Sequence, residues 1–171
     1  MNKQLIGFYS GHAPDSQGRK IDDILAWPDE RLESVHDYIQ WVFPLQEASM
    51  FNPNAPLLDA DDIAYFRSSA HLQDMVRRSF YRILEFYGFF MTETDGHVHV
   101  TRAGNFKFQS CNWLNFSDHN HLRITRIMKF LCLVGFRAQA EGLLRALEGV
   151  HQSYPGVISE ETMRYWSDAV K

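Results

Sequence analysis

The sequence predicts an all-α domain of about six helices, with one small β-hairpin near residues 91–101. Apolar residues recur at i, i+3 and i+4 in several segments, which places them on one face of a helix. Residues 91–101 instead alternate polar and apolar side chains around Asp95-Gly96, a pattern typical of a hairpin. The chain has 171 residues, 45% of them hydrophobic, which is enough for one core. We therefore expect a single domain over residues 1–171.

The first clear helix is predicted to follow Trp27-Pro28 and to run from Asp29 to Phe43. Apolar residues recur in it at helical spacing, and acidic side chains near its start suit the positive end of the helix dipole. Pro44 is expected to end it, because proline lacks the N–H group that a continuing helix needs.

A helical region, in one helix or two, is predicted between Asp59 and Gly88. Asp59, with Asp62 three residues later, is typical of an N-cap, and an apolar stripe runs from Leu72 as far as Gly88. His71 is a candidate break between the two helices, which the pattern does not decide.

Three more helices are predicted in the last third of the chain. Their limits are marked by small polar residues, which cap helix starts, and by glycines, which favour the conformation that follows a helix end. These helices run from Ser117 or Asp118 to Gly135, from Ala138 to Leu147 with an end at Gly149, and from Ser159 through Met163 and Trp166.

The net charge of −4 conceals a basic segment over residues 102–137. This segment holds six basic residues and only one acid, Asp118, together with aromatic side chains that include Phe106, Phe108, Trp113 and Phe116. Aromatic and basic residues together can bind nucleic acid, because rings stack on bases and cations hold phosphates. Pairing with the acidic N-terminal third is the favoured interpretation, since nucleic-acid modules usually carry a basic balance overall.

No stretch of the sequence has the apolar length of a signal peptide or a membrane span. The longest apolar run, residues 127–136, has ten residues and contains Lys129, whereas a bilayer requires about 20. Cys111 and Cys132 are too few for a disulfide scaffold. We therefore expect a cytoplasmic protein with no transmembrane segment.

Two strings in the sequence resemble the signatures of the opioid growth factor receptor family. Residues 32–45, LESVHDYIQWVFPL, resemble the first signature, which usually has leucine at the position of Val42. Residues 120–128, NHLRITRIM, resemble the second, and residues 82–88, RILEFYG, fall between them as expected. The resemblance runs from about Phe8 to Ala169.

The resemblance implies a binding domain and, less directly, a ligand. Animal members are described as nuclear and perinuclear receptors for the pentapeptide met-enkephalin that restrain cell proliferation. They carry a long polar extension with a nuclear-import signal, which this chain lacks, so we expect a stand-alone version of the conserved domain. A bacterial source is one open alternative, and for such a protein the ligand is left open.

Polar residues of the two signatures are the candidate ligand-binding residues. In a continuous helix, Glu33, His36, Asp37 and Gln40 form one polar stripe next to Trp41, and Arg123 and Arg126 lie on one side of another helix. The candidate ligand-binding residues are Glu33, His36, Gln40, Trp41, Arg123 and Arg126.

Two interpretations of these residues stay open. In the first, Glu33 or Asp37 pairs with Arg123 or Arg126 and only braces the fold. In the second, the groups line a pocket in which Glu33 takes a peptide's amino group and an arginine takes a carboxylate or phosphate.

The sequence predicts neither catalysis nor a cofactor. Its eight histidines lack the HExxH and C-x-x-C spacings of zinc sites, and no glycine-rich phosphate loop occurs. We therefore expect a non-enzymatic domain with no catalytic residues, metal or cofactor, whose partner is a short peptide or a protein. The alternatives are a nucleic-acid-binding module using residues 102–137 and a purely structural interaction domain; the oligomeric state is left open.

Overall fold

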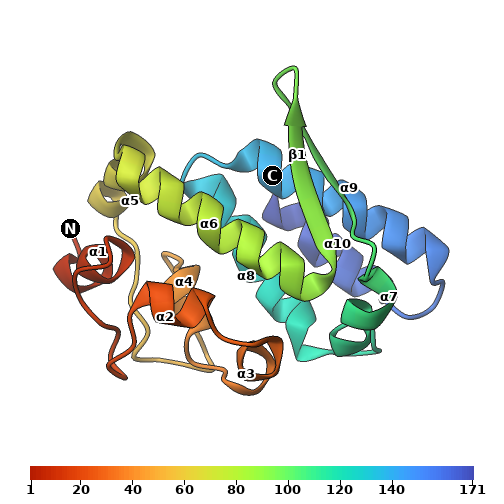
Figure 1. Ribbon diagram of the computed structural model, residues 1–171, viewed down its shortest axis with the longest axis horizontal. Coiled ribbons are helices and arrows are strands. Elements are labelled where there is room, and N and C mark those ends of the chain that lie inside the picture. The colour runs from red at the N-terminus through yellow and green to blue at the C-terminus, as the bar shows by residue number, and fades with distance from the viewer. The chain divides into compact units, whose positions relative to one another are not determined.

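The computed structural model describes residues 1–171, which form ten α-helices, one 3-10 helix and one two-stranded antiparallel sheet (Figure 1). The predicted fold class, mostly helical with a small hairpin, is confirmed. Helices outnumber the expected six because several are only one or two turns long, too short to show a periodic apolar pattern. The chain divides into two compact units, residues 1–80 and 81–171, and the boundary falls within helix α6 (Ala70–Tyr87).

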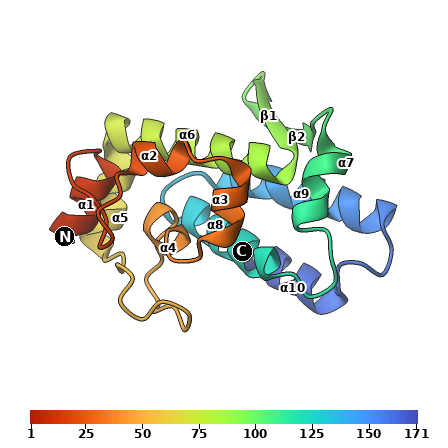
Figure 2. The ribbon, with the colours of Figure 1, turned by 60° about the horizontal axis from the view of Figure 1, so that its bottom comes forward.

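The first unit consists of short helices and the beginning of α6 (Figure 2). Aromatic rings connect these helices: Phe8 packs edge-on against Trp41 at 5.3 Å between ring centroids, and Tyr9 packs against Phe66 at 4.8 Å. The Tyr9 hydroxyl also donates to the carbonyl of Val42 at 2.9 Å. The helices that precede α6 are α1 (Lys3–Tyr9), α2 (Ile21–Leu25), α3 (Asp29–Ser34), α4 (Ile39–Val42) and α5 (Ala60–Ser68).

The prediction of one helix from Asp29 to Phe43 is wrong. Helix α3 ends at Ser34, Val35 is extended with ψ 130°, and α4 begins only at Ile39. Contacts made by the intervening turn outweigh the helical pattern. The Asp37 carboxylate lies 2.8 Å from the Arg19 guanidinium, and the Tyr38 hydroxyl donates to the Leu32 carbonyl at 2.8 Å.

The predicted helical region between Asp59 and Gly88 consists of two helices, α5 and α6, which is one of the two alternatives that the sequence left open. Asp59 and Asp62 form a reciprocal capping box at the start of α5, in which each side chain accepts from the other's backbone N–H. The break falls at Ser69, two residues before His71, and α6 ends before Gly88, which has a φ of +90°.

The second unit contains a hairpin packed beside a long helix (Figure 1). Strand β1 (Phe89–Thr94) pairs with β2 (His97–Arg102) in a register that sets Met91 opposite Val100. The turn residues Asp95 and Gly96 both have positive φ, as a tight hairpin turn requires. The remaining elements are α7 (Phe106–Gln109), the 3-10 helix η1 (Ser110–Asn112), α8 (His119–Leu133), α9 (Arg137–Ser153) and α10 (Glu160–Ala169).

Helix α9 approaches β2 closely at Gly142. A Cβ at this position would lie 3.1 Å from Val98 Cγ1 and 3.2 Å from Val100 Cγ2. The two valines form the buried face of β2, whereas His97 and His99 alternate with them and are exposed. Because Gly142 has no side chain, the valines of β2 can pack directly against the backbone of α9.

Two of the three C-terminal helices have the predicted limits. The Asp118 carboxylate caps α8 by accepting from the N–H of Asn120 at 2.8 Å, and Gly135 follows the end of that helix with a φ of +97°. Ser159 caps α10. The predicted end of the preceding helix at Gly149 is wrong, since α9 continues to Ser153. No helix of the chain combines the length and the apolar character needed to span a membrane.

Candidate functional site

Four of the six predicted ligand-binding residues belong to the first unit, where they do not form the expected polar stripe. Glu33 is half-buried on α3, His36 is exposed in the turn that follows, and Gln40 and Trp41 are buried on α4. The stripe is absent because the turn between α3 and α4 interrupts the helical spacing on which it depended.

An ion-pair network built on Arg19 fixes this turn. The guanidinium lies 2.8 Å from Asp37 Oδ1 and, on its other side, 2.8 Å from Asp15 Oδ2. The Asp15 side chain is fully buried, and its second oxygen accepts from the backbone N–H groups of Gln17 and Arg19. Asp37 therefore pairs with Arg19 of its own unit.

Gln40 is a buried polar side chain with an unsatisfied atom. The residue is 5% exposed, and its Oε1 atom accepts no hydrogen bond. Leaving such an acceptor unpaired costs roughly 1–3 kcal/mol. Its neighbour Trp41 is 2% exposed and is held against Phe8. Among the candidate residues of the first signature, Gln40 is thus the one with a buried polar atom that has no hydrogen-bond partner.

The two predicted arginines lie on α8 of the second unit, three residues apart, as expected. Arg123 is buried and its Nη1 atom lies 3.5 Å from Asn120 Oδ1, while Arg126 is half-buried. Asn120 is itself fully buried, with its amide group donating to the carbonyl of Asn112 at 3.2 Å. The first turn of α8 is therefore a polar segment inside an apolar core.

His121 of the second signature sits between two tryptophan rings. It contacts Trp113 and Trp166 edge-on, at 6.4 and 5.5 Å between ring centroids. Its Nε2 donates to the Trp113 carbonyl at 2.9 Å, and its own carbonyl accepts from the Trp166 indole N–H at 3.0 Å. Burial lowers the pKa of His121 below its ordinary value, although the bond to Trp113 opposes this shift. This arrangement favours a neutral, structural histidine.

The basic segment over residues 102–137 divides its aromatic residues between core and surface. Phe106 and Trp113 are buried, and Trp113 donates its indole N–H to the carbonyl of Tyr87 at 2.9 Å. Phe108 and Phe116 are 78% and 75% exposed. Phe130 and Phe136, the other two phenylalanines of the segment, are also buried, so only Phe108 and Phe116 are accessible to a stacking partner.

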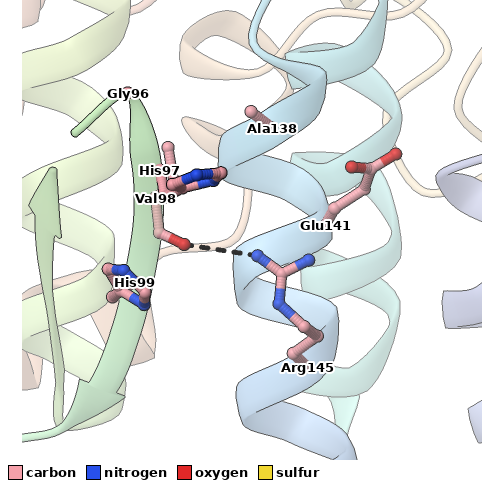
Figure 3. A pocket seen from close by; sticks show the side chains of 7 residues that line it. All are labelled: Gly96, His97, Val98, His99, Ala138, Glu141 and Arg145. Atoms are coloured by element: carbon pink, nitrogen blue, oxygen red, sulfur yellow. Dashed lines mark hydrogen bonds between the residues drawn. The ribbon is translucent and has the colours of Figure 1, made fainter. Parts of the chain in front are cut away.

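A cleft of about 470 Å³ lies between β2 and α9, wholly within the second unit (Figure 3). Ligand pockets commonly have volumes of roughly 300–1,000 Å³. One wall is the outer edge of β2 and the other is a flank of α9. The residues that line the cleft are Gly96, His97, Val98, His99, Ala138, Glu141 and Arg145.

The charged groups of this cleft come mainly from α9. Arg145 reaches across to β2, where its Nη2 donates to the Val98 carbonyl at 3.2 Å (Figure 3). The carboxylate of Glu141, one turn earlier, forms no ion pair or hydrogen bond. The Arg145 guanidinium thus reaches the strand edge, whereas the Glu141 carboxylate points away from β2 (Figure 3). Together with two imidazoles, these groups give the cleft lining a mixture suited to a ligand that carries both charges and backbone amides.

Sequence reasoning missed the α9 half of this cleft. The alternation of His97 and His99 on one strand face was visible in the sequence, but Glu141 and Arg145 read only as polar positions on an amphipathic helix. No local sequence pattern predicts that this side of α9 faces the hairpin, because β2 and the Glu141–Arg145 segment are about forty residues apart.

The chain is similar to several curated proteins over most of its length. The opioid growth factor receptor of Homo sapiens is 38% identical over 159 residues, which are 88% of this chain and 23% of that receptor. The receptor of Rattus norvegicus is 40% identical over 131 residues, 75% of this chain and 22% of the receptor. Opioid growth factor receptor-like protein 1 of Mus musculus is 35% identical over 147 residues, 82% of this chain and 30% of that protein.

This chain therefore spans less than a third of the length of these relatives. No solved structure matches it. The family model described as the opioid growth factor receptor conserved region matches residues 2–171, a span that includes both signatures, the hairpin and all the helices described above. On this match, the chain belongs to the opioid growth factor receptor family.

Proposed function

We propose that this chain is a non-enzymatic binding domain whose ligand is a short peptide. The cleft between β2 and α9 is the main support for this proposal. It has the volume of a ligand pocket, it is lined by the charged side chains of Glu141 and Arg145, and it borders a strand edge that no other strand covers. The relatives' name, opioid growth factor receptor, supports a peptide as the class of ligand. The human receptor matches 88% of this chain, so its matched segment includes the cleft residues between 96 and 145.

The cleft chemistry suits a peptide better than an apolar small molecule. Arg145 can hold a carboxylate through paired N–H donors, and Glu141 can accept from an amino group. The edge of β2 adds backbone donors and acceptors that a peptide can match. Apolar lining is limited to Val98 and Ala138, so affinity would depend on hydrogen bonds and charge.

The residues of the two signatures are proposed as ligand-binding positions in their own units. In the first unit the proposal covers Glu33, His36, Gln40 and Trp41, and it has its best support at Gln40, whose Oε1 would gain a missing hydrogen bond from a ligand N–H. In the second unit it covers Arg123 and Arg126 on α8. A peptide bound at the cleft and one bound at Gln40 are separated by the variants below.

The first test is a thermal-shift titration with met-enkephalin, beside the same peptide acetylated at its amino terminus. A ligand at 100 times its dissociation constant stabilises the folded state by about 2.7 kcal/mol, a rise of several degrees in melting temperature for a chain of this length. We expect the free peptide to give this shift and the acetylated peptide to give a smaller one, because acetylation removes the ammonium group. No shift with either peptide at millimolar concentration would contradict the proposal.

Two substitutions locate the bound peptide. Glu141→Gln removes the carboxylate of the cleft but keeps the shape of the side chain, and Gln40→Met removes the unpaired acceptor at nearly constant volume. We expect Glu141→Gln to weaken binding at least fivefold if the peptide amine lies in the cleft. Loss of binding in Gln40→Met alone would instead assign the ligand to the first signature.

Nucleic-acid binding is the second candidate function, because Phe108 and Phe116 are exposed within the basic segment. Titration of a single-stranded oligonucleotide at low and at moderate salt tests it. Binding that falls steeply as salt is added, and that is weakened by Phe108→Ser, would support this function, whereas no binding at low salt would exclude it.

A further inference from the structure

Strand β2 has an outer edge that no strand covers. The sheet has only two strands, and β1 pairs with one side of β2. In an antiparallel pair, alternate residues direct their backbone groups at the partner strand and the others direct them outward. The Ala103 N–H donates to the Gly88 carbonyl in continuation of the same register. This parity makes His97 and His99 the residues bonded to β1, and it leaves Val98 and Val100 facing the open edge.

The bond from Arg145 agrees with this assignment. The Val98 carbonyl accepts from Arg145 Nη2, a group on α9, and so it points away from β1. This is the one bond in which the outward backbone groups of Val98 and Val100 take part. A strand edge with free donors and acceptors is a template for another extended chain.

We propose that the outer edge of β2 receives the C-terminal residues of a short peptide as a third strand, and that Arg145 binds the peptide's terminal carboxylate. This rests on the proposed function and names the mode and polarity of binding at the same cleft. In strand addition the main chain supplies most of the affinity and the flanking side chains supply specificity. The free edge from Val98 to Val100 is long enough to pair with a segment of about three residues.

Arg145 is placed to change partners when a peptide arrives. In the free protein its guanidinium is exposed and is held at the edge by a single bond to the Val98 carbonyl. When the peptide binds as a strand, one of its backbone N–H groups donates to the Val98 carbonyl in place of Arg145. The released guanidinium then pairs with a carboxylate, which it can hold through two parallel bonds.

The surroundings of Arg145 favour an anion at this position and leave room for a strand. His97 and His99 line the same cleft and can offer imidazole N–H donors to an anion beside Arg145. Ala138 contributes only a methyl group to the α9 wall, one to two turns before Arg145. The contact of Gly142 with the valines holds the sheet on the helix, so the edge is already positioned before a ligand binds.

Amide hydrogen exchange of the intact chain tests the strand addition directly. The N–H groups of Val98 and Val100 are expected to exchange rapidly in the free protein, and at least tenfold more slowly with saturating met-enkephalin. The N–H groups of His97 and His99 serve as the internal control, because β1 already binds them and their exchange should change little. Peptide binding without protection of the two valines would overturn the proposal while leaving the proposed function intact.

Calorimetric titrations test the carboxylate. Amidation of the peptide's C-terminus and Arg145→Gln should each weaken binding about tenfold, and combining them should weaken it no further, because both remove the same ion pair. Arg164→Gln is the matched control, since Arg164 is exposed on α10 outside the cleft. Equal affinity for the acid and the amide would overturn the role of Arg145. No binding by any of the peptides would overturn both this inference and the proposed function.

Discussion

The Arg19 guanidinium lies 2.8 Å from the Asp37 carboxylate and ties the turn between α3 and α4 to the segment before α2. The same guanidinium contacts the buried Asp15, so one cation serves two carboxylates of very different exposure. Asp15 is fully buried, whereas 46% of the Asp37 side chain is exposed. The network explains why the first signature folds as two short helices joined by a turn.

Arg19→Ala is expected to lower the free energy of unfolding by about 3 kcal/mol, because it leaves the Asp15 carboxylate buried without a counter-charge. Urea denaturation monitored by circular dichroism measures this loss. Arg78→Ala is the matched control: Arg78 pairs with Asp22 at 2.9 Å, but both side chains are half exposed, and a change within about 0.5 kcal/mol is expected. Equal losses in the two variants would contradict the structural role of Arg19.

The stability of the chain is expected to fall as the pH decreases below about 6.5, partly through His121. Burial lowers the pKa of His121 in the folded state, so below its ordinary value the unfolded chain binds more protons than the folded one. The contribution is fully present above the unfolded pKa and is lost as the pH falls toward the folded pKa.

The matching variant for this prediction is His121→Gln, which keeps an N–H donor for the Trp113 carbonyl but cannot be protonated. Unfolding free energies of both proteins at pH 7.5 and 5.5 isolate the contribution of this residue from those of the other seven histidines. We expect the variant to lose less stability than the unsubstituted chain between these two pH values. An identical loss in both proteins would show that His121 does not contribute.

Gly142→Val is expected to destabilise the chain by about 1–3 kcal/mol, because the new side chain would overlap the methyl groups of Val98 and Val100. Gly149→Val, on the same helix, is the control. A Cβ there would meet only Arg102 Nη2, at 3.9 Å, and the change should be close to neutral. Thermal unfolding of the two variants provides the comparison, and similar melting temperatures would argue against the close approach of α9 to β2.

Asp118→Ala should cost about 1 kcal/mol of stability, because it removes the side-chain acceptor for the Asn120 N–H at the start of α8. Asp118→Asn keeps an acceptor oxygen and should retain most of that stability. Guanidinium denaturation of the three proteins distinguishes them. If Asn were as destabilising as Ala, the effect would come from the lost charge rather than from the cap.

The helices and strands whose ends are marked by capping or turn residues could be predicted from the sequence alone. Asp95 and Gly96 both adopt the positive φ that a tight hairpin turn needs, and the strands on either side were expected near their observed positions. Asp59 and Asp118 cap helices because a carboxylate can accept from nearby N–H groups in any fold. These features depend on residues that are close in sequence.

Helices α1, α2 and α4 were not predictable in this way. Each has between four and seven residues, a length at which an isolated helix is unstable in water. Their stability comes from tertiary contacts such as the bond between the Tyr9 hydroxyl and the Val42 carbonyl. The same kind of contact, from Arg19 to Asp37, overrode the helical pattern that predicted a single helix there.

The sequence by itself determined the family, the mostly helical class and the hairpin, since these follow from signature strings, apolar spacing and turn residues. Only the tertiary structure decided which polar groups share a site. Arg145 reaches the edge of β2, and Glu141 lines the same cleft, because Gly142 lets α9 lie against Val98 and Val100. Such a contact joins segments about forty residues apart, and it is selected by close packing rather than by any pattern along the chain.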